Sequence, residues 1–172
     1  LNSSLQLSTF HTTSAGKGIA GNINATAESN GDLYVGGIFG GTNTISAQNI
    51  VKWDGSAWSS LGDGVDGPVS SILVDGNKVY VAGSFANAGS VPASNIAVWD
   101  TSTESWSALG SGTNGTNNDV LDLLKQGSKI YAVGTFTQAG GNSANYVAVW
   151  DGTSWSNLGS GTDNDVNSIA YM

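Results

Sequence analysis

The feature that most constrains the fold is a long repeat in which aromatic residues recur at fixed spacings. In each copy a Tyr precedes a Phe by five residues, and that Phe precedes a Trp by fourteen. A second Trp, a Leu three residues later and a G-x-G follow. The sets are Tyr34, Phe39, Trp53, Trp58 and Leu61; Tyr80, Phe85, Trp99, Trp106 and Leu109; and Tyr131, Phe136, Trp150, Trp155 and Leu158. A repeat of this kind predicts an array of similar units.

Each copy contains the signals of four short β-strands. In the second copy they fall at residues 69–75, 78–85, 96–99 and 106–109, which are rich in β-branched and aromatic residues and end at Gly, Asn or Asp. Such runs between turn residues predict strands. The sequence VLDLLKQ at residues 120–126 is the only one tempting as a helix. Its counterparts VSSILVD and VNSIAYM resemble strands, so we predict a strand there too.

The same register extends to both ends of the sequence. Residues 16–31 align with residues 62–76, which places third and fourth strands at residues 4–7 and 11–15 and a lone first strand at residues 166–172. The sequence thus predicts one domain over 1–172, built from partial unit 1–16, full units 22–64, 68–112 and 120–161, and partial unit 166–172. This amounts to about 3.75 units, with both ends inside a unit. Insertions are predicted at residues 101–104 and 114–118.

A four-stranded antiparallel unit has two faces to cover and two open edges. Stacking such units face to face around an axis buries both faces, which is the architecture of a β-propeller. Tyr80, Phe85, Trp99 and Trp106 would then fill the space between units. Gly83 and its equivalents would mark a bend or a close backbone approach. A β-solenoid is the alternative fold, although its coils are usually shorter and lack spaced Trp pairs.

The order of a Tyr strand ending in Gly, a Trp-Asp strand, a turn, Trp and Leu resembles the kelch repeat, including the double glycine Gly36-Gly37. The sequence pattern YVAGSF…IAVWD…WSALGSG, within residues 80–112, is similar to the kelch-like repeats of extracellular proteins. These include the fungal cortical cell-polarity marker family and bacterial surface proteins. The resemblance covers about residues 4–172. It implies an all-β, kelch-like β-propeller segment of four-stranded antiparallel blades. The double glycine occurs only in the first full copy, which disfavours the intracellular kelch adaptors.

Charge and composition exclude several classes of function. The chain has 5 Lys+Arg against 13 Asp+Glu, so nucleic acid and anionic membranes would be repelled. There is no Cys and a single His, His11, which excludes disulfides and multi-His metal sites. No apolar run approaches the roughly 18 residues of a membrane span. The Ser, Thr, Asn and Gly content is typical of extracellular or cell-surface proteins. Since the chain starts at Leu1, we expect a processed chain or an excised fragment.

No catalytic or cofactor-binding site is predicted. His11 lies in a degenerate copy without a positioned nucleophile, and no Gly-Lys-Ser/Thr follows the glycines of residues 36–41. Each Trp-Asp pair is interpreted as a core Trp followed by an Asp that opens a turn. Acidic residues in the turns after the G-x-G could gather Ca²⁺, although ordinary turn chemistry explains them better. The predicted cation-site residues are Asp63, Asp66, Asp163 and Asp165.

Other surface features are N-glycosylation sequons and one unplaced aromatic. The sequons begin at Asn2, Asn24 and Asn114 and matter only if a eukaryote secretes the protein. Asn114 is predicted to be the best acceptor and Asn24, on an axis-facing strand, the poorest. Tyr146 lies outside the aromatic columns, so its side chain is predicted to be available at the surface.

The predicted function is that of a non-catalytic extracellular or cell-surface repeat protein acting in recognition, adhesion or structural assembly. The partner would be a protein or glycan bound at one loop face. Residues 87–93, 101–104 and 114–118 are the predicted recognition loops, because they differ most between copies. Alternatives are a lectin-like propeller and a subunit that self-associates by strand exchange through open edges. A galactose-oxidase-type enzyme needs a Cys-modified Tyr and His copper ligands, which this sequence does not supply.

Overall fold

The computed structural model describes residues 18–110 and 115–171, and within these ranges the chain is all-β, with no helix. The strands form three antiparallel four-stranded sheets and two small hairpins. The predicted partial unit at residues 1–16 lies outside the described residues, as does His11. No helix in the described part is long or apolar enough to cross a membrane.

Each sheet is built from consecutive strands of one sequence copy. The first sheet contains β1 (Ile19–Ser29), β2 (Asp32–Thr42), β3 (Ile50–Trp53) and β4 (Trp58–Ser60). The second contains β5 (Val69–Asp75), β6 (Lys78–Gly83), β9 (Ile96–Asp100) and β10 (Ser105–Ala108). The third contains β11 (Val120–Gln126), β12 (Lys129–Gly134), β15 (Val147–Trp150) and β16 (Trp155–Asn157). The predicted strands at residues 69–75 and 120–126 are therefore confirmed to the residue.

Two small hairpins lie in the loops between the second and third strands of a sheet. They are β7 (Asn87–Ala88) with β8 (Val91–Pro92), and β13 (Gln138–Ala139) with β14 (Asn142–Ser143). The first sheet has no such separate hairpin, because β2 itself continues to Thr42. The sequence analysis did not predict these hairpins.

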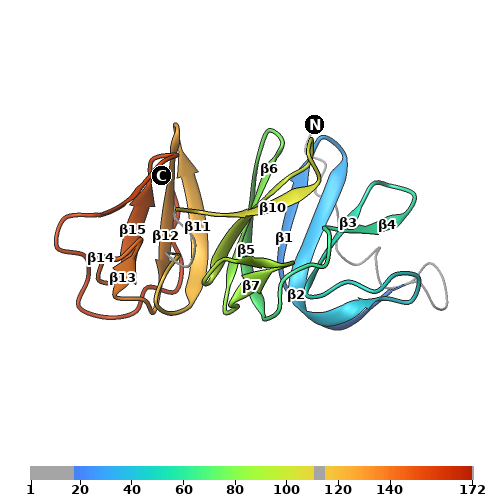
Figure 1. Ribbon diagram of the computed structural model, residues 1–172, viewed down its shortest axis with the longest axis horizontal. Coiled ribbons are helices and arrows are strands. Elements are labelled where there is room, and N and C mark those ends of the chain that lie inside the picture. The colour runs from blue at the N-terminus through green and yellow to red at the C-terminus, as the bar shows by residue number, and fades with distance from the viewer. Residues whose placement is uncertain (1–17, 111–114, 172) are drawn as a thin grey trace.

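The three sheets lie side by side along the long axis of the molecule, with their first strands β1, β5 and β11 next to one another (Figure 1). One hydrophobic core fills the space between the first and second sheets and includes Phe85 and Trp99, and a second core fills the space between the second and third sheets. Tyr80 and Trp106 are half-buried against these cores. The predicted role of Tyr80, Phe85, Trp99 and Trp106 between units is confirmed.

A tryptophan side chain also links the second sheet to the first and the third sheet to the second. Trp106 Nε1 donates to the carbonyl oxygen of Leu61 at 2.8 Å, and Trp155 Nε1 donates to that of Leu109 at 3.0 Å. Within each sheet this Trp contacts the earlier Trp of its copy, with ring centroids 5.2 to 5.4 Å apart. Tryptophan is suited to this position because its ring fills the core while its single N–H finds an acceptor.

The glycine at the end of the second strand is required by a close backbone approach. A Cβ on Gly83 would overlap the carbonyl oxygen of Pro68, and one on Gly134 would overlap that of Asp119. Both contacts lie beside a register shift at the start of the paired first strand, between Val69 and Ser71 in the second sheet. The predicted close approach at Gly83 and its equivalents is confirmed.

The structure corrects two details of the predicted register. Residues 166–171 form no strand, although Val166 N–H donates to the carbonyl oxygen of Gly134. In the three sheets the first strand pairs with the second strand, and among the described residues none pairs with residues 166–171 as a strand. The insertion in the second copy lies before Gly115, because Gly115 packs against the Ser94 carbonyl as Gly64 packs against that of Gln48. It was predicted at residues 114–118.

Candidate functional site: the hairpin face

The sheets have two ends that differ in the connections they carry. One end, here called the hairpin face, carries the loops between second and third strands (residues 43–49, 84–95 and 135–146) and the segments that follow the fourth strands (residues 61–68, 115–119 and 158–165). The other end, the turn face, carries the tight turns. In Figure 1 the hairpins labelled β7, β13 and β14 lie along the lower side.

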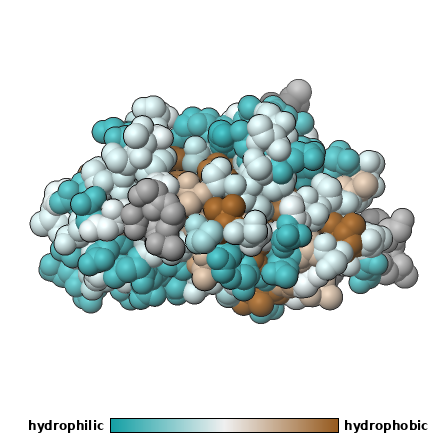
Figure 2. Space-filling view, viewed as in Figure 1, coloured by the Kyte–Doolittle hydropathy of each residue, from teal (hydrophilic) through white to brown (hydrophobic). Residues whose placement is uncertain are grey.

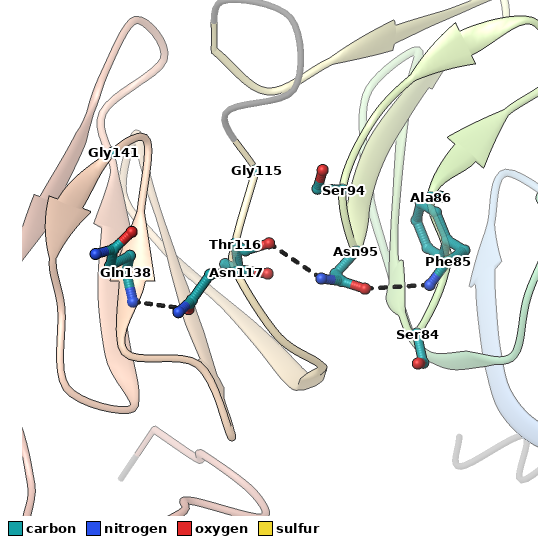
Figure 3. A pocket seen from close by; sticks show the side chains of 10 residues that line it. All are labelled: Ser84, Phe85, Ala86, Ser94, Asn95, Gly115, Thr116, Asn117, Gln138 and Gly141. Atoms are coloured by element: carbon teal, nitrogen blue, oxygen red, sulfur yellow. Dashed lines mark hydrogen bonds between the residues drawn. The ribbon is translucent and has the colours of Figure 1, made fainter.

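A groove of about 500 Å³ opens on the hairpin face between the second and third sheets. Its lining comes from the second hairpin loop, from the junction at residues 115–117 and from the third hairpin loop (Figure 3). Ser84, Asn95, Thr116, Asn117 and Gln138 line it together with backbone and small side chains, and no charged side chain is among them. Hydroxyl and amide groups of this kind can hydrogen-bond a neutral polar ligand or a peptide backbone.

A second groove of about 470 Å³ lies at the junction of the first and second sheets. Gln48, Gly64 and Asp66 line it at positions that match Ser94, Gly115 and Asn117 of the first groove. It also contains Asp63, so this groove carries two carboxylates where the other is neutral. The repeat therefore places grooves at equivalent junctions but gives them different charge.

Asn95, one of the residues that line the first groove, has a hydrogen-bonded side chain, drawn in Figure 3. Its Oδ1 accepts from Phe85 N–H at 3.2 Å, and its Nδ2 donates to the Thr116 carbonyl oxygen at 3.0 Å. Asn49 makes the same pair of bonds, to Phe39 N–H at 3.1 Å and to the Val65 carbonyl oxygen at 2.8 Å. We call this arrangement the asparagine bridge, because it ties a hairpin loop to the start of the next sheet.

The asparagine bridge requires the left-handed backbone region, where φ is 62° at Asn49 and 64° at Asn95. Asn tolerates this region better than other residues that carry a Cβ. In the third hairpin loop the equivalent residue is Tyr146, with φ at 69°. Its N–H donates to the Phe136 carbonyl oxygen, as Asn95 N–H donates to that of Phe85. The backbone is thus conserved among the three loops while the side-chain bridge is not.

A second polar clamp holds each small hairpin against the preceding junction. Asp66 Oδ1 accepts from the N–H groups of Ala86 and Asn87 at 2.8 and 2.9 Å, and Asp66 Oδ2 accepts from Asn87 Nδ2. Asn117 Oδ1 accepts in the same way from Thr137 and Gln138 N–H, each at 2.9 Å. Asp66 in one copy and Asn117 in the next therefore hold the small hairpin in the same way, one with a carboxylate and the other with an amide oxygen.

These bonds set the acidity of Asp66. Partial burial raises its pKa, but the hydrogen bonds from Asn87 and from Ala86 N–H outweigh that effect and hold the pKa below its usual range. Asp54, in the turn after β3, shows the same effect more strongly, since N–H groups of Ala57 and Ser56 and the Ser56 hydroxyl lower its pKa to about 2. Both carboxylates stabilise loop backbone in the charged form.

Lysines are absent from the hairpin face in the part of the chain that the structure describes. The four described lysines all lie in strands, and three pair with aspartates: Lys52 with Asp32, Lys78 with Asp100, and Lys125 with Asp75. The hairpin face instead carries five aspartates, namely Asp63, Asp66, Asp119, Asp163 and Asp165. The negative charge of the chain is therefore least compensated at the hairpin face.

The four predicted cation ligands do not come together. Asp63 and Asp66 lie at the first junction, whereas Asp163 and Asp165 lie after the third sheet. Among the described residues no group of three or more His, Cys, Asp or Glu side chains could hold a metal ion. The Asp66 carboxylate is already used by the hairpin clamp. A Ca²⁺ site at these residues stays a prediction.

The structure separates the predicted recognition loops. Residues 87–93 contain the small hairpin β7–β8 and lie on the hairpin face, as do the described residues 115–118. Residues 101–104 lie on the turn face, where Thr101 N–H donates to the Asn77 carbonyl oxygen of the neighbouring turn. The three variable loops therefore do not form one surface.

The remaining predicted sites are placed as follows. Asn24 has an exposed side chain in β1, and its Nδ2 donates to the Val69 carbonyl oxygen at 3.1 Å. Asn2 and Asn114 lie outside the described residues. The Asp of each Trp-Asp pair accepts backbone N–H bonds in the following turn, for example Asp151 from Thr153 and Ser154. The structural interpretation of these pairs is confirmed.

Comparison with known proteins then decides the family. Residues 4–172 match the model of the Rax2 C-terminal beta propeller domain. The chain belongs to this family. The Rax2 propeller family is related to the fungal cell-polarity marker, so that part of the predicted resemblance is confirmed, together with the all-β propeller fold of four-stranded sheets. The family description names a propeller domain and no catalytic activity. The kelch-like and bacterial resemblances and the number of blades stay predictions.

Solved structures similar to this Rax2-type propeller chain include two computationally designed proteins. The Ika4 protein is 16% identical with a TM-score of 0.62, over 92% of this chain and 84% of its own. The Ika8 protein is 17% identical with a TM-score of 0.57, over 87% of this chain and 40% of its own. At these identities the likeness concerns the fold alone. No curated protein matches the chain significantly.

Proposed function

We propose that the chain is a non-catalytic recognition module of a cell-surface protein and that it binds a protein partner through the hairpin face. The observation that carries the proposal is that both grooves open on this face, at equivalent junctions between sheets. The turn face is occupied by tight turns that bond one another, as in the contact of Asn77 Nδ2 with Ser102 Oγ at 2.6 Å. Loops positioned by a rigid scaffold are the usual carriers of binding function.

The family supports the cell-surface part of the proposal, because it is related to a fungal polarity marker. The surface chemistry supports a polar partner. Figure 2 shows a mostly hydrophilic surface on which hydrophobic residues form small separate patches. A partner held here would rely on hydrogen bonds and on complementary positive charge at the rim, which give specificity and association rate more than affinity.

The test is a pair of matched double variants in the full-length protein. Ser84→Arg with Gln138→Arg places bulky side chains at exposed positions that line the groove. Ser128→Arg with Thr153→Arg adds the same charge at exposed positions of the turn face. Proximity labelling on living fungal cells should recover the same surface protein with wild type and with the turn-face variant, but not with the groove variant. Equal recovery with both variants would contradict the proposal.

A glycan ligand is the second candidate, favoured by the neutral hydroxyl and amide lining of the groove. A glycan array probed with wild type and the groove variant separates the two. Binding that the groove variant loses would replace the protein partner by a glycan. Absence of any binding would remove the lectin alternative.

Self-association is the third candidate, favoured by the exposed apolar side chains Leu158 and Tyr171. Light scattering of the isolated chain tests it. A stable monomer of 17.4 kDa would exclude it.

A further inference from the structure

The second groove, between the first and second sheets, has charged side chains in its lining, whereas the first groove has none. It has a volume of about 470 Å³, and the exposed carboxylates of Asp63 and Asp66 belong to its lining. The three lysine–aspartate pairs of the described residues involve neither of these carboxylates. The second groove therefore carries negative charge that no described lysine neutralises.

The hydrogen bonds of Asp66 keep it charged and leave it able to accept one more donor. Its Oδ1 accepts from the N–H groups of Ala86 and Asn87, and its Oδ2 accepts from Asn87 Nδ2 at 2.7 Å. Burial raises the pKa of Asp66, but these bonds outweigh that effect and lower the pKa below its usual range. A carboxylate has about four acceptor positions, so three bonds leave one for a donor in the groove.

The charge of Asp66 is not required by the hairpin clamp. In the first groove Asn117 takes the place of Asp66. Its Oδ1 accepts from Thr137 and Gln138 N–H at 2.9 Å each, so an amide oxygen is enough to hold a small hairpin. The negative charge is therefore a property that the second groove has beyond what its fold needs.

Aromatic rings lie directly behind the lining of the second groove. A Cβ on Gly62 would lie 3.1 Å from Trp99 Cζ3, and one on Gly89 would lie 3.3 Å from Trp106 Cδ1. Both glycines line the groove, and the centroids of the two rings are 5.2 Å apart. Trp106 is half-buried, whereas Trp155 at the equivalent position is 5% exposed. Carboxylates beside tryptophan rings favour a cation whose charge is spread over a flat group.

We propose that the second groove binds the guanidinium group of an arginine side chain presented by the protein partner. A guanidinium group donates paired hydrogen bonds to a carboxylate and also stacks on aromatic rings, whereas an ammonium group is a compact point charge. A metal ion fits the groove less well, because no group of three or more His, Cys, Asp or Glu side chains among the described residues could hold one. The inference rests on the proposed function, since this groove opens on the hairpin face.

The site can be tested by NMR titration of the ¹⁵N-labelled chain with the peptide acetyl-Gly-Arg-Gly-amide. The same peptide with citrulline in place of arginine is the control, because it has the same shape without the charge. A lysine peptide supplies the charge without the flat guanidinium. We expect the arginine peptide to shift the Gly64 and Gly89 amide resonances in a saturable way, while Gly115 and Gly141 of the first groove stay unchanged. The citrulline peptide should shift none of them, and the lysine peptide should bind more weakly.

Three matched variants locate the binding. Asp63→Asn and Asp66→Asn should each weaken binding of the arginine peptide about fivefold, the upper end of what an exposed ion pair contributes. Asp66→Asn should keep the fold, because Asn117 makes the same two backbone contacts in the next copy. Asp165→Asn removes the same charge from the hairpin face outside the groove lining and should leave the affinity unchanged.

Several outcomes would overturn the proposal. One is the absence of a saturable shift at Gly64 and Gly89 with the arginine peptide. An equal response to the citrulline peptide would show that charge is not recognised, and an equal response to the lysine peptide would remove the arginine assignment. An equal loss of affinity in all three variants would indicate general attraction to an acidic face. None of these results affects the labelling test of the first groove, so failure of the arginine site and failure of the recognition proposal are distinguishable.

Discussion

The junction between the second and third sheets and the segment after the third sheet have the same sequence pattern but different environments. Leu109 is 2% exposed and its carbonyl oxygen accepts from Trp155, whereas Leu158 is 48% exposed. The second hairpin loop contains the asparagine bridge, and the third contains Tyr146. The comparison teaches that a repeat position acquires its energetic value from what packs against it: Leu109 is enclosed in the core that it shares with the third sheet, and Leu158 is exposed.

The largest expected effect is the loss of the buried leucine. Leu109→Ala should lower the free energy of unfolding by about 2–5 kcal/mol, because it removes a side chain from a closed core and leaves a cavity. Leu158→Ala, at the same repeat position, should change it by no more than about 0.5 kcal/mol. Chemical denaturation of both variants measures the difference. Similar losses at the two positions would mean that Leu158 is also buried in solution.

The next effect is the loss of an asparagine bridge. Asn95→Ala leaves Phe85 N–H and the Thr116 carbonyl oxygen without their partner and should cost about 1–3 kcal/mol. The same denaturation experiment should show that Tyr146→Ala costs less, since that side chain makes neither bond. If the two substitutions were equally destabilising, the bridge would not account for the difference between the loops.

The reverse substitution should stabilise the protein. Tyr146→Asn relieves left-handed backbone strain of about 1 kcal/mol and offers partners to Phe136 N–H and the Thr162 carbonyl oxygen. We expect a higher melting temperature in calorimetry. Asn95→Tyr, the opposite exchange at the equivalent position, should lower the melting temperature. A lower melting temperature for Tyr146→Asn would show that the tyrosine side chain contributes packing that outweighs the bridge.

The smallest expected effect is a difference between the two hairpin clamps in how stability depends on pH. Because the pKa of Asp66 is lowered by folding, its contribution is present above the unfolded pKa of about 3.9 and is lost as the pH falls through the folded value. Asn117 in the other clamp does not titrate. The melting temperature of Asp66→Asn should therefore fall less steeply below about pH 4 than that of wild type. The change is below about 1 kcal/mol, since Asp66 is largely exposed. Identical acid profiles would contradict the assignment.

Sequence reasoning predicted the strands better than the connections. Residues 69–75 and 120–126 were identified because β-branched runs end at turn residues, which is a local signal. The small hairpins were missed, since each of their strands has two residues and depends on a clamp from a distant Asp66 or Asn117. The insertion was misplaced because only the packing of Gly115 against Ser94 identifies its equivalent of Gly64.

Part of the candidate site also had a signal in the sequence. Asn49 and Asn95 each lie ten residues after the Phe of their copy, and Tyr146 occupies that position in the third. The sequence analysis noted Tyr146 only as an aromatic outside the columns. Without a structure, neither the backbone conformation at this position nor the two groups that the asparagine bridges could be inferred.

The sequence by itself determined the all-β fold, the units and the aromatic residues between them, because the repeat spacing and strand patterns are encoded locally in every copy. Only the tertiary structure decided which equivalent positions are satisfied. A buried N–H or carbonyl oxygen finds its partner on a neighbouring loop or sheet, so its state depends on contacts between segments far apart in sequence. The buried Phe136 N–H differs from the N–H groups of Phe39 and Phe85 for that reason.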